Sequence, residues 1–290
     1  MYGRHLNRAI DYVLATQRSR GVFSRIAPVP PATHLSAAQT VHYNHAIAGL
    51  MLGEVYGMTH GERSERIEIA LHRALLYHRE VQAWGKQLPT DAGGFRYGAP
   101  EGPDASSDLS VTGWSLMFYR SARNAEFNVP KVYFDEGLDF VERCYETDPA
   151  LHLKGVFRYR PKVNETDAPQ ITLPNTSSAA LTLILGGRQD RRSVQTAIEW
   201  IEGRDYPRLF GESYYYLATY YTSQALAQVG GAPWNKVYPQ IAHSLLEVQT
   251  KAGAWPGGTQ SERTYGPSYS TSLAILALTP PYQLLPIFQR

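Results

Sequence analysis

Cysteine is nearly absent from this chain of 290 residues, and long apolar runs and blocks of like charge are missing. The single cysteine, Cys144, excludes a disulfide within the chain, and its helical context favours a buried thiol. No run of about 18 apolar residues occurs, so we expect no membrane-spanning helix. The N-terminal residues lack the apolar core of a signal peptide. Localisation stays open, and an exported or envelope location stays an option if the chain is a fragment of a longer one.

Charged side chains are also few, at 19% of the residues, and the formal net charge is only +2. Lys and Arg are scattered among Asp and Glu, without the basic cluster that binds nucleic acid. Aromatic residues are plentiful instead, with 20 Tyr, 5 Trp and 9 Phe. A tyrosine joins an apolar ring to a polar hydroxyl, so it suits the lining of a cavity as well as helix packing.

Helical periodicity dominates the chain, because apolar residues recur at three- and four-residue spacing. Alternating patterns typical of strands are short and confined to loops rich in Gly, Pro and Asp. The sequence therefore predicts an all-α protein. The predicted helices are 4–17, 42–57, 63–82, 110–126, 131–145, 176–186, 191–202, 213–229, 235–250 and 269–279.

Four loops repeat a glycine followed two positions later by an aromatic residue. They are Gly21-Val22-Phe23, Gly93-Gly94-Phe95, Gly155-Val156-Phe157 and Gly253-Ala254-Trp255. A glutamine precedes three of them, at Gln17, Gln82 and Gln249. We predict that Phe95, Phe157 and Trp255 are buried between helical hairpins.

Five helices begin with a small polar residue or histidine, followed three places later by a small residue on the same helix face. The first positions are His45, Thr112, Ser177, Thr219 and Thr271. Small residues allow the close packing that the inner wall of a ring requires. We therefore predict one α/α toroid domain over 1–290, with about five helical hairpins in an inner and an outer layer. If the inner helices run parallel, these five side chains form a polar circle that attracts an anion.

The glutamine, glycine and aromatic element resembles the repeat of squalene–hopene cyclases and protein prenyltransferase β subunits. A closer resemblance is to bacterial proteins, mostly from planctomycetes, described as containing prenyltransferase and squalene-oxidase repeats. It covers most of 40–290 and is carried by 43–48, 56–59, 93–97, 108–114, 121–123, 128–130, 215–221, 230–234, 269–273 and 285–287. That group has no assigned reaction, so the resemblance implies a terpenoid cyclase-like architecture and little chemistry.

The chain departs from the catalytic motifs of these enzymes. No Asp-x-Asp-Asp acid motif occurs, since Asp104 and Asp108 have the wrong spacing. Cys144 lacks the aspartate two residues earlier that completes the prenyltransferase zinc site. The Cys-Gly-Glu-Gln motif of thioester toroids is absent as well. These departures disfavour three known functions of the fold, and we expect no cofactor.

Candidate catalytic residues are weak. Asp104 and Asp108 precede an inner helix and could transfer protons, although Asp108 is also a good N-cap. His42 and His45 share a helix face, but no carboxylate or thiol nearby completes a metal site, so we expect no metal. His45 is a further candidate for a polar site.

Candidate ligand-binding residues are more numerous. Arg96-Tyr97 and Arg158 form twin sites that could grip a pyrophosphate or a uronate, or could pair with acidic side chains. Tyr216 and Tyr220 share a face that could hold an isoprenoid, stack on sugars or pack between helices. Trp114, Arg263, Tyr265 and Tyr269 complete this set.

The predicted function is a binding or scaffold module whose aromatic central cavity or funnel holds a ligand or a partner segment. Small molecules and polymers, anionic ones included, and protein segments are the candidate ligands; nucleic acid is not. The alternative is a divergent toroid enzyme, a polysaccharide lyase or hydrolase before an isoprenoid cyclase or transferase.

Overall fold

The structure is a computed structural model that describes residues 3–27, 40–86, 88–98, 106–164 and 166–289. Within these ranges the chain forms eleven α-helices and five short 3-10 helices, with isolated β-bridges and no strand. The all-α prediction is confirmed. The α-helices are α1 (Gly3–Ala15), α2 (Val41–Tyr56), α3 (Glu62–Ala83), α4 (Leu109–Asn124), α5 (Lys131–Arg143), α6 (Leu173–Leu185), α7 (Arg192–Glu202), α8 (Tyr215–Val229), α9 (Gly231–Glu247), α10 (Gln260–Tyr265) and α11 (Pro267–Leu278). The 3-10 helices are η1 (Pro89–Asp91), η2 (Pro149–Leu151), η3 (Tyr206–Arg208), η4 (Pro280–Tyr282) and η5 (Pro286–Phe288).

Ten of these helices correspond to the ten predicted segments, and the largest differences are at the N-terminus of α6 and at both ends of α9, which ends at Glu247 instead of 250. Helix α6 begins at Leu173 instead of 176, and α9 begins at Gly231 instead of 235. Pro174 and Pro233 occupy their first turns, where a backbone N–H has no helical partner and its absence costs nothing. Helix α10 was missed.

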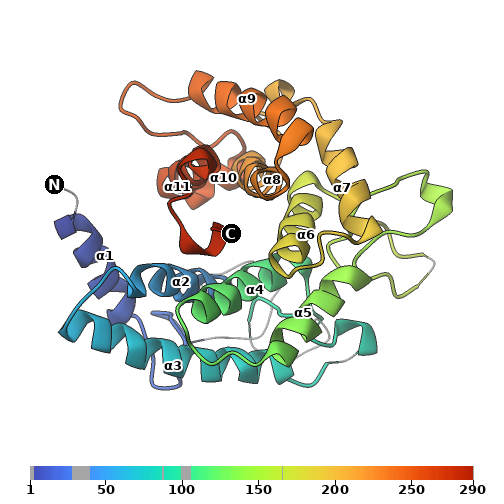
Figure 1. Cartoon of the computed structure of the whole chain (residues 1–290). Coiled ribbons are helices and arrows are strands. Elements are labelled where there is room, and N and C mark those ends of the chain that lie inside the picture. The colour runs from blue at the N-terminus through green and yellow to red at the C-terminus, as the bar shows by residue number, and fades with distance from the viewer. Residues whose placement is uncertain (1–2, 28–39, 87, 99–105, 165, 290) are drawn as a thin grey trace. The chain divides into compact units, whose positions relative to one another are not determined.

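The chain divides into two compact units, Met1–Arg143 and Cys144–Arg290. In the first unit α2 packs most extensively on α4, and α3 and α5 pack on α2 and α4 respectively (Figure 1). The close approach of α2 to α4 requires a small residue, because a Cβ atom at Gly49 would lie 2.6 Å from the Phe118 ring. Gly49 lies next to Ala48 of the small-residue pattern, and it lets α2 approach α4 closely.

In the second unit α8 lies between α6 and α11, and α7 and α9 pack on α6 and α8 (Figure 1). Ser177 Oγ and Thr222 Oγ1 are hydrogen-bonded at 2.8 Å between α6 and α8. Predicted inner helices therefore pack on each other within each unit. Closure of all five into one ring, and the single domain, stay predictions.

The four repeated loops share one contact with the helix that follows. In each, the aromatic residue is buried and donates its backbone N–H to a polar side chain near the start of a helix that the sequence predicted to be inner. The pairs are Phe23 with His45 Nδ1 (3.2 Å), Phe95 with Thr112 Oγ1 (2.9 Å), Phe157 with Thr176 Oγ1 (3.2 Å) and Trp255 with Thr271 Oγ1 (3.1 Å). Burial of the three aromatic residues is confirmed, and Thr176 takes the place expected for Ser177.

The glutamines of the repeat fasten these loops. The amides of Gln17, Gln82 and Gln249 each donate to the carbonyl of the loop glycine, at 3.0, 3.1 and 3.0 Å. Gln17 and Gln82 also donate to carbonyls of α3 and α5, at 2.7 and 2.8 Å. In the remaining loop Tyr145 takes this role, with its hydroxyl 3.0 Å from Thr196 Oγ1 on α7. Three of the four loops are therefore joined to a further helix, α3, α5 or α7.

A Gln82→Met variant is expected to lose about 2–3 kcal/mol of stability. Gln82 is 2% exposed and makes four hydrogen bonds, with two carbonyls, the Tyr119 hydroxyl and Arg79. Methionine keeps the volume but leaves buried partners unsatisfied, which costs about 1–3 kcal/mol for each group. Urea denaturation measures the loss. Gln240→Met removes only a local bond to Lys236 O on α9 and should change stability by less than about 0.5 kcal/mol; similar losses for both variants would contradict the fastening role.

Candidate functional site

The two arginines predicted to grip an anion are each paired with a carboxylate of their own unit. Arg96 Nη1 lies 3.1 Å from Asp108 Oδ2, and the Asp108 side chain is fully buried. Arg158 Nε pairs with Glu146, and both side chains are buried. Of the two interpretations of the twin sites, pairing with acidic side chains is confirmed. Removing either partner would leave a buried charge without its counterion.

Asp108 also begins α4, since its Oδ1 accepts the Val111 N–H at 2.9 Å. The N-cap interpretation of this residue is confirmed. Asp104 lies outside the described residues. Trp114 is buried on α4, and the Tyr97 ring lies 5.2 Å from that of Tyr43 on α2. Tyr97, Asp108 and Trp114 are therefore parts of the packing between the loop that contains Phe95 and the helices α2 and α4.

His45 belongs to a buried group of three histidines with His42 and His78. His45 Nδ1 accepts the Phe23 N–H, so the neutral ring carries its proton on Nε2. Its ring lies 5.3 Å from that of His78. Burial, with the neighbouring imidazoles, holds the pKa of His45 well below its usual value. A neutral, fully buried ring is suited to packing in the interior of the first unit.

Tyr216 and Tyr220 lie in the interior of the second unit. Both are at most 1% exposed, and the Tyr216 hydroxyl donates to the Pro256 carbonyl at 2.5 Å. Tyr220 stacks in a tilted pair with Tyr221, at 5.0 Å between ring centres. Because α8 is flanked by α6 and α11, the shared face of these two tyrosines packs against helices.

Other tyrosines of the second unit lie at its surface. Tyr214 and Tyr265 are 40% and 48% exposed, and the Tyr265 ring lies 5.1 Å from that of Tyr269. Tyr214 is near enough to raise the pKa of both other phenols, although burial is the larger cause. We call these three residues, at the start of α8, the end of α10 and the first turn of α11, the tyrosine surface.

Tyr214 carries a backbone feature that loops rarely show. Its φ of 64° places a bulky side chain in the left-handed region, at the N-cap position of α8. Such a conformation costs about 1–3 kcal/mol and recurs at functional sites. It gives α8 a start without a side-chain cap and leaves the Tyr214 ring at the surface.

Short α10 holds the tyrosine surface in place. Glu262 is fully buried and forms a capping box with Thr259, and its Oε1 accepts the Tyr216 N–H at 3.3 Å. Arg263, one residue on, is exposed, and its guanidinium donates to the Gly258 carbonyl at 3.2 Å. The sequence carries a signal for this helix, because Thr259-Gln-Ser-Glu262 has the spacing of a capping box.

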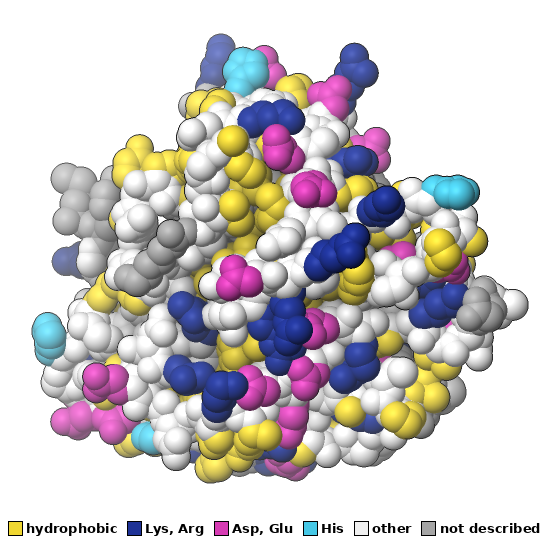
Figure 2. Space-filling view, turned by 45° about the vertical axis from the view of Figure 1, so that its right-hand side comes forward, with side chains coloured by type: hydrophobic (Ala, Val, Ile, Leu, Met, Phe, Trp, Pro, Cys, Tyr) yellow, Lys and Arg dark blue, Asp and Glu magenta, His cyan; other side chains and the backbone are white. Residues whose placement is uncertain are grey.

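Charge is mixed over the face shown in Figure 2, where Lys and Arg alternate with Asp and Glu without a patch of one sign. Among the described residues, no three His, Cys, Asp or Glu side chains gather as metal ligands. None of the helices in the described ranges is long and apolar enough to cross a membrane.

No protein-family model matches the chain, and no curated protein is similar enough to it to match.

Proposed function

We propose that this chain is a ligand-binding module with an α/α toroid architecture, related to the bacterial prenyltransferase and squalene-oxidase repeat proteins. The repeated loops support this architecture, because each fixes an aromatic residue to an inner helix through the same backbone bond. A toroid built from repeated helical hairpins requires the same loop geometry in each hairpin. An experimental structure in which the five inner helices do not close into one layer would contradict it.

The tyrosine surface carries the proposal of binding. Tyr214, Tyr265 and Tyr269 place three phenols together, with Arg263 beside them in the sequence of α10. The Tyr214 and Tyr265 rings, 40% and 48% exposed, suit a ligand with both carbon–hydrogen faces and hydroxyls, and an exposed guanidinium suits a carboxylate. An acidic oligosaccharide, such as an oligouronate, meets these requirements better than an isoprenoid, which would prefer a dry cavity.

The surroundings of three buried carboxylates favour a binding function over a catalytic one. Asp108 and Glu146 each pair with an arginine, and Glu262 accepts backbone N–H groups. A general acid or base must reach a substrate proton, and these three carboxylates are buried and already bonded.

Oligogalacturonate is expected to bind the wild-type protein, and Arg263→Ala is expected to weaken binding about tenfold. Loss of a hydrogen bond to a charged group corresponds to about 1.5–3 kcal/mol, or at least a factor of ten. Titration calorimetry measures both affinities, and farnesyl pyrophosphate serves as the isoprenoid comparison.

Arg204→Ala is the matched control, because Arg204 is also exposed in the second unit but stacks on Trp200 at 4.3 Å. The affinity of the Arg204→Ala variant for oligogalacturonate should equal that of the wild type. Binding that survives both Arg263→Ala and Tyr265→Ala, or no binding of either probe, would refute the tyrosine surface as a ligand site.

A further inference from the structure

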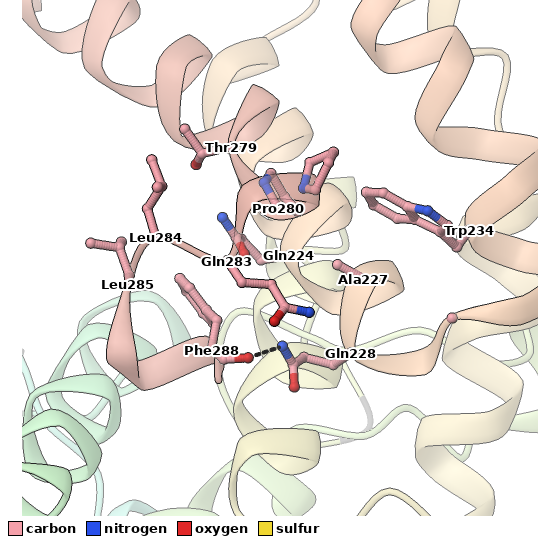
Figure 3. A pocket seen from close by; sticks show the side chains of 12 residues that line it. Gln224, Ala227, Gln228, Trp234, Thr279, Pro280, Gln283, Leu284, Leu285 and Phe288 are labelled. Carbon is pink, nitrogen blue, oxygen red and sulfur yellow. Dashed lines mark hydrogen bonds between the residues drawn. The ribbon is translucent and has the colours of Figure 1, made fainter. Parts of the chain in front are cut away.

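A pocket of about 300 Å³ opens at the C-terminal end of α8, in the second unit (Figure 3). Its walls come from three places: the last turns of α8, the first turn of α9, and the segment that follows α11. The lining residues that matter here are Gln224, Gln228, Trp234, Gln283 and Phe288. None of these residues belongs to the tyrosine surface, so the pocket is a separate site.

The pocket contains no ionisable side chain. Its lining consists of glutamine amides, a threonine hydroxyl, one indole, and proline, leucine, alanine, glycine and phenylalanine. A charged ligand would lose its hydration there without meeting a counterion, which is costly. The composition therefore selects an uncharged ligand.

Buried amides give the pocket directional polar groups. Gln224 is 2% exposed, and its Nε2 donates to the Leu276 carbonyl at 2.8 Å, which fixes the amide. Among the described residues, nothing donates to Gln224 Oε1, although this residue lines the pocket. Gln228 is fixed in the same way, since its Nε2 donates to the Phe288 carbonyl at 2.9 Å (Figure 3). A ligand hydroxyl can donate to Gln224 Oε1.

The indole of Trp234 supplies a flat apolar wall. Tyr238 stacks on it with 4.0 Å between ring centres and 17° between planes. Trp234 lines the pocket and Tyr238 does not, so the tyrosine supports the indole from the side away from the pocket. The stack holds the ring rigid, which lowers the entropy cost of binding.

We propose that this pocket binds a neutral pyranose sugar, whose carbon–hydrogen face packs on Trp234 while its hydroxyls bond to the glutamine amides. The pairing of a flat apolar face with fixed amide groups matches the two kinds of surface that a pyranose carries. A proline-rich peptide would also pack on an indole, but it would require a groove with repeated apolar sites. The pocket volume of about 300 Å³ has room for a single sugar ring.

The test uses the full chain and calorimetric titration with the methyl glycosides of glucose, galactose, mannose and N-acetylglucosamine. At least one should bind, and its charged analogue, glucuronate or glucose 6-phosphate, should bind at least tenfold more weakly. Trp234→Leu should weaken binding at least tenfold, since a central aromatic anchor carries much of the binding energy. Trp200→Leu on α7 is the matched control and should leave affinity unchanged.

A second variant guards against a folding defect in the first. Gln283 has a φ of 46°, so Gln283→Gly keeps the backbone conformation while it removes the amide, and it should also weaken binding. Oligogalacturonate binding should persist in both variants, which separates this site from the tyrosine surface. Equal affinity for charged analogues, binding that survives Trp234→Leu and Gln283→Gly, or binding of no neutral glycoside would overturn the proposal.

Discussion

A Gly93→Ala variant is expected to lose about 2–5 kcal/mol of stability. Gly93 has a φ of 80°, a region where a side chain costs about 1–2 kcal/mol. A Cβ atom there would also lie 2.2 Å from the Glu136 carbonyl oxygen on α5, so the loop and the helix must separate. Overpacking of this kind adds about 1–3 kcal/mol. Chemical denaturation, followed by circular dichroism, measures the loss.

Gly253→Ala is the matched control, because Gly253 holds the equivalent place in the last repeat. Its φ is 83°, but the nearest atom to a new Cβ is 4.0 Å away. Only the conformational cost of about 1–2 kcal/mol should appear. The difference between the two variants then measures the close approach of loop to outer helix. Equal losses would mean that φ alone selects glycine at these positions.

The repeated loops explain how much of the fold the sequence predicted. Glycine, glutamine and the aromatic residue act through contacts that each loop makes in the same way, so similar residues imply similar geometry. Hydrophobic periodicity found helices such as α5 and α7 because each buries one face, whereas α4, α6 and α8 are apolar or small on almost all sides and are buried on almost all sides. The six-residue helix α10 escaped, since it is too short to show a period and depends on its capping box.

The candidate site was less predictable, because partners depend on tertiary packing. Arg96 pairs with Asp108, which follows it, whereas Arg158 pairs with Glu146, which precedes it. The two loops look alike in sequence, and nothing local chooses the partner. Likewise, the spacing of Tyr216 and Tyr220 predicted a shared face but could not show that helices cover it. The pocket residues Gln224, Trp234 and Gln283 carry no joint motif and were not predicted.

Stability is expected to fall by at least about 4 kcal/mol between pH 8 and pH 5, through the three buried histidines of the first unit. Burial lowers the pKa of His42 to about 4 and of His78 to about 3, and holds that of His45 well below 6.5. Their neutral forms are bonded inside: His42 Nδ1 donates to the Arg96 carbonyl, and its Nε2 accepts from the Tyr77 hydroxyl. In the unfolded chain each titrates near 6.5.

The direction of the pH dependence follows from which state, folded or unfolded, binds more protons. Between pH 6.5 and about 4 the unfolded chain holds up to three more protons than the folded one, so stability rises with pH in this window. The contribution of the neutral histidines to stability is fully present above pH 6.5. It is lost as the pH falls toward the pKa values of the folded state. At pH 5 His42 and His78 each contribute a loss of about 2 kcal/mol, and His45 adds to it, so the sum is a large part of the whole stability of many domains.

Denaturation midpoints between pH 5 and 6.5 isolate this effect, because most carboxylates titrate below that range. His78→Phe keeps a ring against Phe95, whose centre lies 4.5 Å from that of His78, and should lower the pH slope by one proton. His243→Gln changes an exposed ring on α9 and should leave the slope as in the wild type. The slope of stability against pH is the readout, because a change in packing shifts the stability by the same amount at every pH and leaves this slope unchanged. A stability that is flat from pH 7 to pH 5 would show that these histidines become charged within the folded unit.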